Sequence, residues 1–169
     1  MSVAQGSIVT LSRLTARDLK AASKVPFALS AVEPLSNPVR AREVYDETGF
    51  WTDDAGVLAI EVDDRLVGTI QFYRSGPGIQ GFEISLVLHD RDDYGKGYGV
   101  EALKLMSDLL FNAKPNLRRL QLLVPTWDDR AARRVEDAGY ASEGILRKAG
   151  FGADGPEDCI LYSMVRDRG

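Results

Sequence analysis

The hydrophobic pattern of the chain predicts strands along most of its length. Every second side chain of a strand faces the same side of a sheet, so alternation of apolar and polar residues marks a strand. This pattern predicts strands over residues 8–14, 57–62, 66–73, 82–88, 140–147 and 159–165. The nearly continuous apolar run at residues 119–124 is typical of a strand buried on both faces. Three glycines between the last two strands, Gly150, Gly152 and Gly155, predict a loop there.

Helical periodicity occupies the stretches between these strands. Apolar residues that recur every three or four positions predict helices over residues 15–24, 39–47, 100–111 and 128–138. Thr15 with Asp18 fits a capping box, and Asp128 fits an N-cap. Gly49 and Gly139 fit C-terminal stops. The resulting order, β-α-α-β-β-β-α-β-α-β-β, predicts an α/β protein whose mixed sheet carries helices on both faces.

Length and composition indicate one globular domain. The chain has 169 residues, of which 44% are hydrophobic and 27% charged, so it can form a core and does not resemble a disordered chain. We therefore expect a single domain over residues 1–169. No apolar run approaches the roughly 20 residues that span a bilayer, and residues 1–17 lack the pattern of a secretion signal. A cytoplasmic location without a membrane partner is expected.

The charged and metal-binding residues argue against several classes of partner. One cysteine, Cys159, and one histidine, His89, are too few for an internal disulfide or a zinc site. The net charge of −4 argues against general nucleic-acid binding. It is compatible with a cationic acceptor such as an amine.

The most informative segment lies at residues 93–102, between a predicted strand and a predicted helix. Gly95, Gly97 and Gly99 alternate there with larger residues, and glycine adopts positive φ cheaply and lets a ligand approach the backbone. The helix that follows leaves its first N–H groups unpaired and turns its positive dipole end toward the loop. We therefore predict a binding site for phosphate or pyrophosphate. The spacing matches neither the P-loop nor the dinucleotide fingerprint, which disfavours a nucleoside triphosphatase and a dinucleotide oxidoreductase.

Five segments together resemble the GNAT superfamily of N-acetyltransferases. They are residues 11–18, 95–102, 128–140, 143–147 and 161–164. Within the superfamily the chain is similar to the branch of ribosomal-protein N-terminal acetyltransferases (RimJ/RimL type) and related small-amine acetyltransferases. The resemblance implies the GNAT fold, a mixed and mostly antiparallel sheet of about six or seven strands, flanked by about four helices and splayed between its two central strands.

The resemblance also implies acetyl-CoA as the cosubstrate, with its pyrophosphate on the backbone amides of the glycine loop. The loop residues that correspond to the family's site are Tyr94, Gly95, Lys96, Gly97, Tyr98, Gly99 and Val100. The pantetheine is implied to enter the gap in the sheet beside Leu86, Val87 and Leu88. Asp128 and Arg134 are implied to lie near the same cofactor.

Three positions depart from the family pattern. Tyr94 stands where Arg or Gln is usual, and Asp128 stands where Asn is usual. Val135 occupies the position of a tyrosine that acts as general acid in many relatives. Valine has no proton to donate, so that role is vacant or belongs to another residue.

The implied reaction, direct attack of an amine on a thioester, needs a base, because an alkyl amine has a pKa near ~10.4. Glu83 is the best candidate, since it points to the face opposite Phe82 and Ile84 and lies a few residues before the loop. The alternative is an ordinary strand carboxylate. Tyr162 and Cys159 are candidates to protonate the leaving thiolate, or else they pack within the sheet.

Three functions remain open at this level. The first is an N-acyltransferase that moves an acetyl or other acyl group from CoA to a small-molecule or peptide amine, which would contact residues 27–37 and 74–80. The second keeps the fold but takes its acyl group from another carrier, such as aminoacyl-tRNA, in natural-product or antibiotic metabolism. The third is a CoA-binding module without catalysis. A homodimer is compatible with all three.

Overall fold

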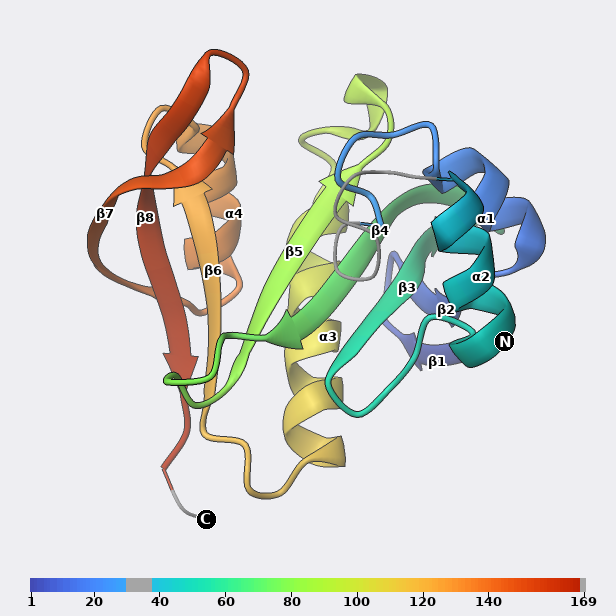
Figure 1. Ribbon diagram of the computed structural model, residues 1–169, viewed down its shortest axis with the longest axis horizontal. Coiled ribbons are helices and arrows are strands. Elements are labelled where there is room, and N and C mark those ends of the chain that lie inside the picture. Colours follow the sequence, from blue (N-terminus) through green and yellow to red (C-terminus); the bar gives the residue numbers. More distant parts are fainter. Residues whose placement is uncertain (30–37, 168–169) are drawn as a thin grey trace.

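The computed structural model describes residues 1–29 and 38–167, which form a sheet with helices packed on it (Figure 1). The strands are β1 (Ser2–Gln5), β2 (Thr10–Arg13), β3 (Ala55–Val62), β4 (Arg65–Arg74), β5 (Phe82–Leu88), β6 (Arg119–Pro125), β7 (Ala141–Gly152) and β8 (Gly155–Val165). The helices are α1 (Ala16–Ala22), α2 (Pro38–Thr48), α3 (Tyr98–Ala113), α4 (Asp129–Asp137) and the short 3₁₀ helix η1 (Arg91–Asp93). Among these described helices, none is long and apolar enough to cross a bilayer.

The eight strands of the described residues belong to one sheet, in the order β1-β2-β3-β4-β5-β6-β8-β7. Neighbouring strands are antiparallel except β5 and β6, which run parallel and are connected through α3. This arrangement confirms the predicted mixed, mostly antiparallel sheet. The hydrophobic pattern does not predict β1, because its four residues are mostly exposed and carry no apolar face.

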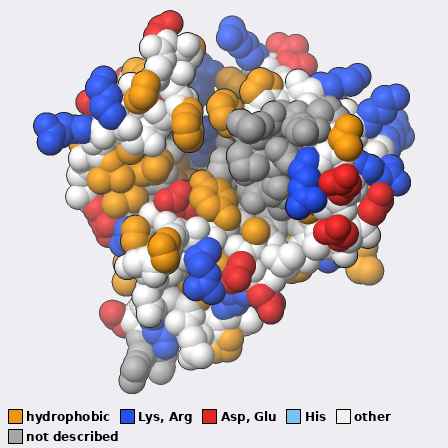
Figure 2. Space-filling view, viewed as in Figure 1, with side chains coloured by type: hydrophobic (Ala, Val, Ile, Leu, Met, Phe, Trp, Pro, Cys, Tyr) orange, Lys and Arg blue, Asp and Glu red, His pale blue; other side chains and the backbone are white. Residues whose placement is uncertain are grey.

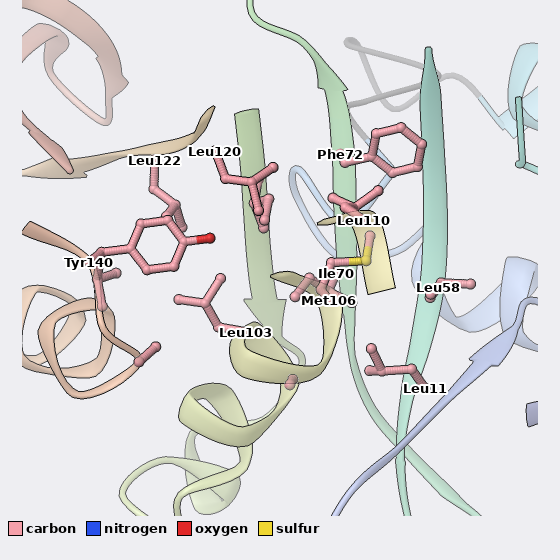
Figure 3. Close-up of a cluster of buried hydrophobic side chains, with 14 of the residues drawn as sticks. Leu11, Leu58, Ile70, Phe72, Leu103, Met106, Leu110, Leu120, Leu122 and Tyr140 are labelled. Carbon is pink, nitrogen blue, oxygen red and sulfur yellow. The ribbon is translucent and has the colours of Figure 1, made fainter. Parts of the chain in front are cut away.

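Helices cover both faces of the sheet, as the alternation of its side chains requires. On β3, Leu58 and Ile60 point into a cluster formed with α3 and α4. Val57 and Ala59 point into a second cluster, formed with α1 and α2. Figure 3 shows the first cluster, in which Met106 of α3 packs beneath the strands. This packing fixes the position of α3, and therefore of its first turn, relative to β5.

The loop expected around residues 150–156 is wrong, because the two last strands continue through it as one antiparallel hairpin. β7 extends to Gly152 and β8 begins at Gly155, with Gly150 paired to Glu157. A Cβ at Gly150 would lie 2.5 Å from the Sγ atom of Cys159, and Gly155 has φ = +117°. The glycines therefore permit close packing and a tight turn within a hairpin.

Glu101, in the first turn of α3, ties this helix to the loop between β1 and β2. Its carboxylate accepts hydrogen bonds from the backbone N–H groups of Ser7, Ile8 and Val9 and from the Ser7 hydroxyl, at distances from 2.5 to 2.9 Å. A Cβ at Gly6 would lie 2.5 Å from the Glu101 Cδ atom, so the loop approaches this closely only with glycine there. These bonds hold the start of α3 beside the N-terminal strands.

We predict that Glu101→Gln lowers the free energy of unfolding by about 1–3 kcal/mol, because an amide NH₂ cannot accept the bonds that the carboxylate accepts. Urea unfolding of the variant and the wild type measures the difference. Asp108→Asn changes an exposed carboxylate on the same helix and is the matched control. It should shift the free energy by less than about 0.5 kcal/mol. Equal stability of Glu101→Gln and the wild type would show that these bonds do not anchor the helix.

Candidate functional site

The two central strands separate soon after they meet. The parallel pairing of β5 with β6 joins only Phe82 to Leu120 and Glu83 to Gln121. β5 nevertheless stays paired with β4 as far as Leu88, and β6 stays paired with β8 over its whole length. Figure 1 shows β5 and β6 diverging beyond the paired positions. This divergence confirms the predicted splay, and it leaves main-chain groups of both strands open to an extended ligand.

Three adjoining cavities run through this gap. The central cavity, of about 220 Å³, lies between β5 and β6 and is bordered by α3 and α4. The loop cavity, of about 530 Å³, lies at the glycine loop, and the outer cavity, of about 560 Å³, lies beside the β7–β8 hairpin. The central cavity shares Leu86, Asp128, Ala131 and Arg134 with the loop cavity, and Tyr73, Glu83, Ser85, Leu123 and Pro125 with the outer cavity. Figure 2 shows this face of the molecule hollowed between the two halves of the splayed sheet.

All but one of the predicted cofactor-binding residues surround the loop cavity. Those that line it are Leu86, Val87, Leu88, Tyr94, Gly95, Gly97, Tyr98, Gly99, Val100, Asp128 and Arg134. The exception is Lys96, whose ammonium lies 3.7 Å from the carboxylate of Asp93. Arg65 donates two hydrogen bonds to that buried carboxylate and thereby lowers the pKa of Asp93. Lys96 therefore braces the loop against Asp93 and does not face the cavity.

The geometry of the glycine loop suits a bound anion. Gly97 is the N-cap of α3 and has φ = +82°. No side chain at this cap accepts a hydrogen bond from the first N–H groups of the helix. A Cβ at Gly95 would meet nothing within 4 Å, and one at Gly97 would meet only Ile8 at 3.8 Å. Gly99 differs, because a Cβ there would lie 2.4 Å from the Arg134 Cδ atom. Glycine at position 99 therefore lets a guanidinium pack beside the positive end of the helix.

Helix α4 adds positive charge to the loop cavity. Arg130, Arg133 and Arg134 all line it, and Arg134 also lines the central cavity. Burial lowers the pKa of Arg134, and the nearby carboxylate of Asp128 opposes that shift. Asp128 accepts a hydrogen bond at 3.0 Å from a backbone N–H of α4, as an N-cap does. The spacing of Arg130, Arg133 and Arg134, within about one helical turn, places the three side chains on a common face of α4.

Glu83 lies where β5 and β6 part, and hydrogen bonds hold it on both sides. The Tyr73 hydroxyl donates to its Oε2 atom at 2.9 Å, and the Gln121 side-chain amide donates to its Oε1 atom at 2.8 Å. Arg119 donates in turn to Gln121 Oε1 at 2.9 Å and to both carboxylate oxygens of Glu143. Burial raises the pKa of Tyr73, and the charge and hydrogen bond of Glu83 raise it further. The chain of bonds crosses the sheet at the point of the splay.

The outer cavity has aromatic and acidic walls. Phe27, Tyr73 and Phe151 line it together with the carboxylates of Glu83 and Glu157. No Lys or Arg belongs to its described lining. Of the segments expected to contact an acceptor, residues 74–80 do not line this cavity, the β7–β8 hairpin lines it in their place, and residues 30–37 lie outside the described part of the chain.

Residues 9–151 match the family model described as the acetyltransferase (GNAT) domain. The chain belongs to this family. Membership accounts for the splayed sheet and for the position of the glycine loop at the start of α3.

Individual GNAT relatives share only part of their sequence with this chain. The probable N-acetyltransferase YjcK of Bacillus subtilis (strain 168) is 36% identical over 87 residues, which cover 51% of this chain and 47% of YjcK, so the match spans about half the length of that relative. Spermidine N-acetyltransferase from Vibrio cholerae, solved with CoA and spermine, has 18% identity and a TM-score of 0.77 over 96% of this chain and 98% of its own. RimJ from Mycobacterium smegmatis, solved with CoA-disulfide, has 20% identity and a TM-score of 0.72 over 93% of this chain and 81% of its own. At these identities the two structures establish a common fold.

The GNAT structure does not bring Tyr162 to the cavities. Its hydroxyl donates to Glu136 Oε1 at 2.8 Å, and burial together with this carboxylate raises the pKa of Tyr162 to about 12. Val135, at the position where the family resemblance implies an acid, is buried and lines the central cavity. Of the three cavities, Cys159 lines only the outer one. The structure therefore separates Tyr162, the predicted acid, from Glu83, the predicted base.

We predict that Glu83→Gln lowers the pKa of Tyr73. The substitution removes a negative charge that disfavours the phenolate, so the phenol should ionise at lower pH than in the wild type. Alkaline titration of phenolate absorbance measures the shift, after subtraction of the curve of the matching protein that carries Tyr73→Phe. Glu61→Gln, at a strand carboxylate outside the three cavities, is the control. An unchanged Tyr73 titration would contradict the contact between the two groups.

Proposed function

We propose that this GNAT protein transfers an acetyl group from acetyl-CoA to a primary amine by direct attack of the amine. The observation that carries the proposal is that the central cavity shares lining residues with the loop cavity on one side and with the outer cavity, at Glu83, on the other. A donor held at the loop and an acceptor held in the outer cavity would meet in the central cavity. Positioning two reactants in this way supplies a large part of the rate enhancement of a bimolecular reaction.

The loop cavity fits the anionic end of CoA. The uncapped N–H groups at the start of α3 and the guanidinium groups of Arg130, Arg133 and Arg134 would bind its phosphates. The open edge of β5 beyond Glu83 would pair with the amides of the pantetheine. When bound, the cosubstrate supplies an acetyl thioester at the central cavity.

Glu83 is the proposed general base. It lines both the central and the outer cavity, so an amine entering from outside passes its carboxylate before reaching the gap. Each carboxylate oxygen has two acceptor sites, so the bonds from Tyr73 and Gln121 leave room for the amine. Glu83 takes the proton that an ammonium group must lose before its nitrogen can attack.

The outer cavity favours a positively charged acceptor. Two carboxylates and three aromatic rings surround it, and both groups attract an ammonium ion. Trp127 donates to Glu157 Oε2 at 2.8 Å and holds that carboxylate at the rim. A polyamine, such as the spermine bound by the Vibrio cholerae protein, and a peptide N-terminus, suggested by the RimJ-type resemblance, both carry this charge. An assay with acetyl-CoA and a panel of amines tests the proposal, with release of the CoA thiol as the measured signal. Absence of acetyl transfer to every amine would overturn the proposal.

Gly97→Glu should abolish CoA binding and leave the protein folded. The substitution places a carboxylate in the anion site and a side chain at φ = +82°. Calorimetry with CoA measures the affinity. Gly49→Glu is the matched control, because Gly49 also has positive φ (+62°) and open space but lies at the end of α2. If Gly97→Glu binds CoA with unchanged affinity, the glycine loop is not part of the CoA site.

Glu83→Gln should lower turnover by about 10²–10⁴-fold with little change in CoA affinity, because the amide cannot take a proton from the amine. Steady-state kinetics and calorimetry on the same protein samples separate the two effects. Glu61→Gln controls for the loss of a strand carboxylate. If Glu83→Gln has the same turnover and pH–rate profile as the control, Glu83 is not the general base.

A further inference from the structure

The departure of a CoA thiolate calls for a proton donor near the central cavity. The polar side chains of its described lining are Tyr73, Glu83, Ser85, Asp128 and Arg134. Arg134 does not release a proton at neutral pH, and the carboxylate of Asp128 caps α4. Tyr73 is the one phenol in this set, and a phenol is far more acidic than the Ser85 hydroxyl.

The residues that the sequence offers for this role are placed elsewhere or lack a proton. The Tyr162 hydroxyl donates a hydrogen bond to Glu136, and Tyr162 lines none of the three cavities. Val135 reaches the central cavity but has no proton to give. Cys159 lines only the outer cavity, and burial raises the pKa of its thiol.

Tyr73 stands beside the proposed base. It pairs directly with Glu83 across β4 and β5, and its hydroxyl donates to Glu83 Oε2 at 2.9 Å. Like Glu83, it lines both the central and the outer cavity, so it borders the place where donor and acceptor would meet. The carboxylate and the phenol form one hydrogen-bonded pair in the shared lining of the two cavities.

A second hydrogen bond fixes the direction of this pair. Gln121 is buried, and its Oε1 atom accepts from Arg119 Nε at 2.9 Å. The amide nitrogen of Gln121 must then face Glu83, where it donates to Oε1 at 2.8 Å. Glu83 Oε2 is thereby left to the Tyr73 hydroxyl. Gln121 and Arg119 are positioning residues for the pair.

We propose that Tyr73 is the general acid that protonates the leaving sulfur, an inference that rests on the proposed acetyltransferase function. Glu83 takes a proton from the ammonium group, and the freed nitrogen then forms its bond to the thioester carbon. The carbon–sulfur bond then breaks, its electron pair goes to sulfur, and the sulfur takes the Tyr73 hydroxyl proton. Glu83 returns its proton to the Tyr73 oxygen, so both side chains regain their starting states. The net result is one proton moved from nitrogen to sulfur, while the other proton of the ammonium passes to solvent.

The charge of Glu83 determines when Tyr73 can act. While Glu83 is ionised, its charge and hydrogen bond hold the pKa of Tyr73 high and keep the phenol protonated. Once Glu83 carries the amine proton, that charge is gone and the phenol becomes a stronger acid. The order of events therefore follows from the contact between the two groups.

Tyr73→Phe keeps the ring and removes the acid. Its turnover with acetyl-CoA should fall by about 10²-fold or more, with CoA affinity and thermal unfolding unchanged. Tyr140→Phe is the matched control, because this buried hydroxyl bonds to Ser107 and lies outside the three cavities. Turnover of Tyr73→Phe equal to that of Tyr140→Phe would overturn the proposal, as would a large loss in Tyr162→Phe with Tyr73→Phe intact. Loss of CoA affinity in Tyr73→Phe would also overturn it.

An activated donor separates proton donation from a merely structural role. The acetyl thioester of a nitrothiophenol releases a weakly basic thiolate that needs no acid. If Tyr73 protonates sulfur, the defect of Tyr73→Phe relative to the wild type should shrink with this donor. If Tyr73 serves only to orient Glu83, the defect should be as large as with acetyl-CoA, and the proposal fails. Wild-type protein that transfers acetyl to no amine would instead overturn the proposed function, and this inference with it.

Discussion

The short pairing between β5 and β6 is the constraint on which the site depends. The two strands share hydrogen bonds only where Phe82 and Glu83 meet Leu120 and Gln121. A full ladder would satisfy the facing main-chain groups, close the central cavity and separate the glycine loop from Glu83. The gap is held open from outside, since β5 keeps β4 as partner, β6 keeps β8, and α3 and α4 fill the face beneath. A defect in one ladder is therefore stabilised by the rest of the sheet.

The residues that close the sheet below the gap are also the residues proposed for chemistry. Glu83 and Gln121 are a register pair across β5 and β6, and Tyr73 and Glu83 are a register pair across β4 and β5. Their side chains bond to one another on the same face, because paired positions of neighbouring strands point the same way. Through Arg119 the bonds continue to Glu143 on β7. Base, proposed acid and the end of the ladder therefore lie in one row across the sheet.

Local pattern predicts the parts of this site that are local in sequence. The glycine loop, the helix after it and the facing of Glu83 follow from spacing alone, and the resemblance adds the splay. The role proposed for Tyr73 could not be predicted from local pattern, because its contact with Glu83 depends on strand register and appears in no motif. The hydrogen bond of Tyr162 to Glu136 could not be predicted for the same kind of reason, since it is set by the packing of α4 on β8. The glycines of the last hairpin suggested a loop, although in the fold they make room for Cys159 and a turn.

A crystal structure of the protein with CoA bound tests the central claim most directly. The account predicts that the diphosphate lies on the N–H groups at the start of α3, and that the pantetheine pairs with β5 beyond Glu83. The thiol should then end beside Glu83 and Tyr73. A structure in which β5 and β6 pair along their full length, or in which CoA binds away from the glycine loop, would contradict the account.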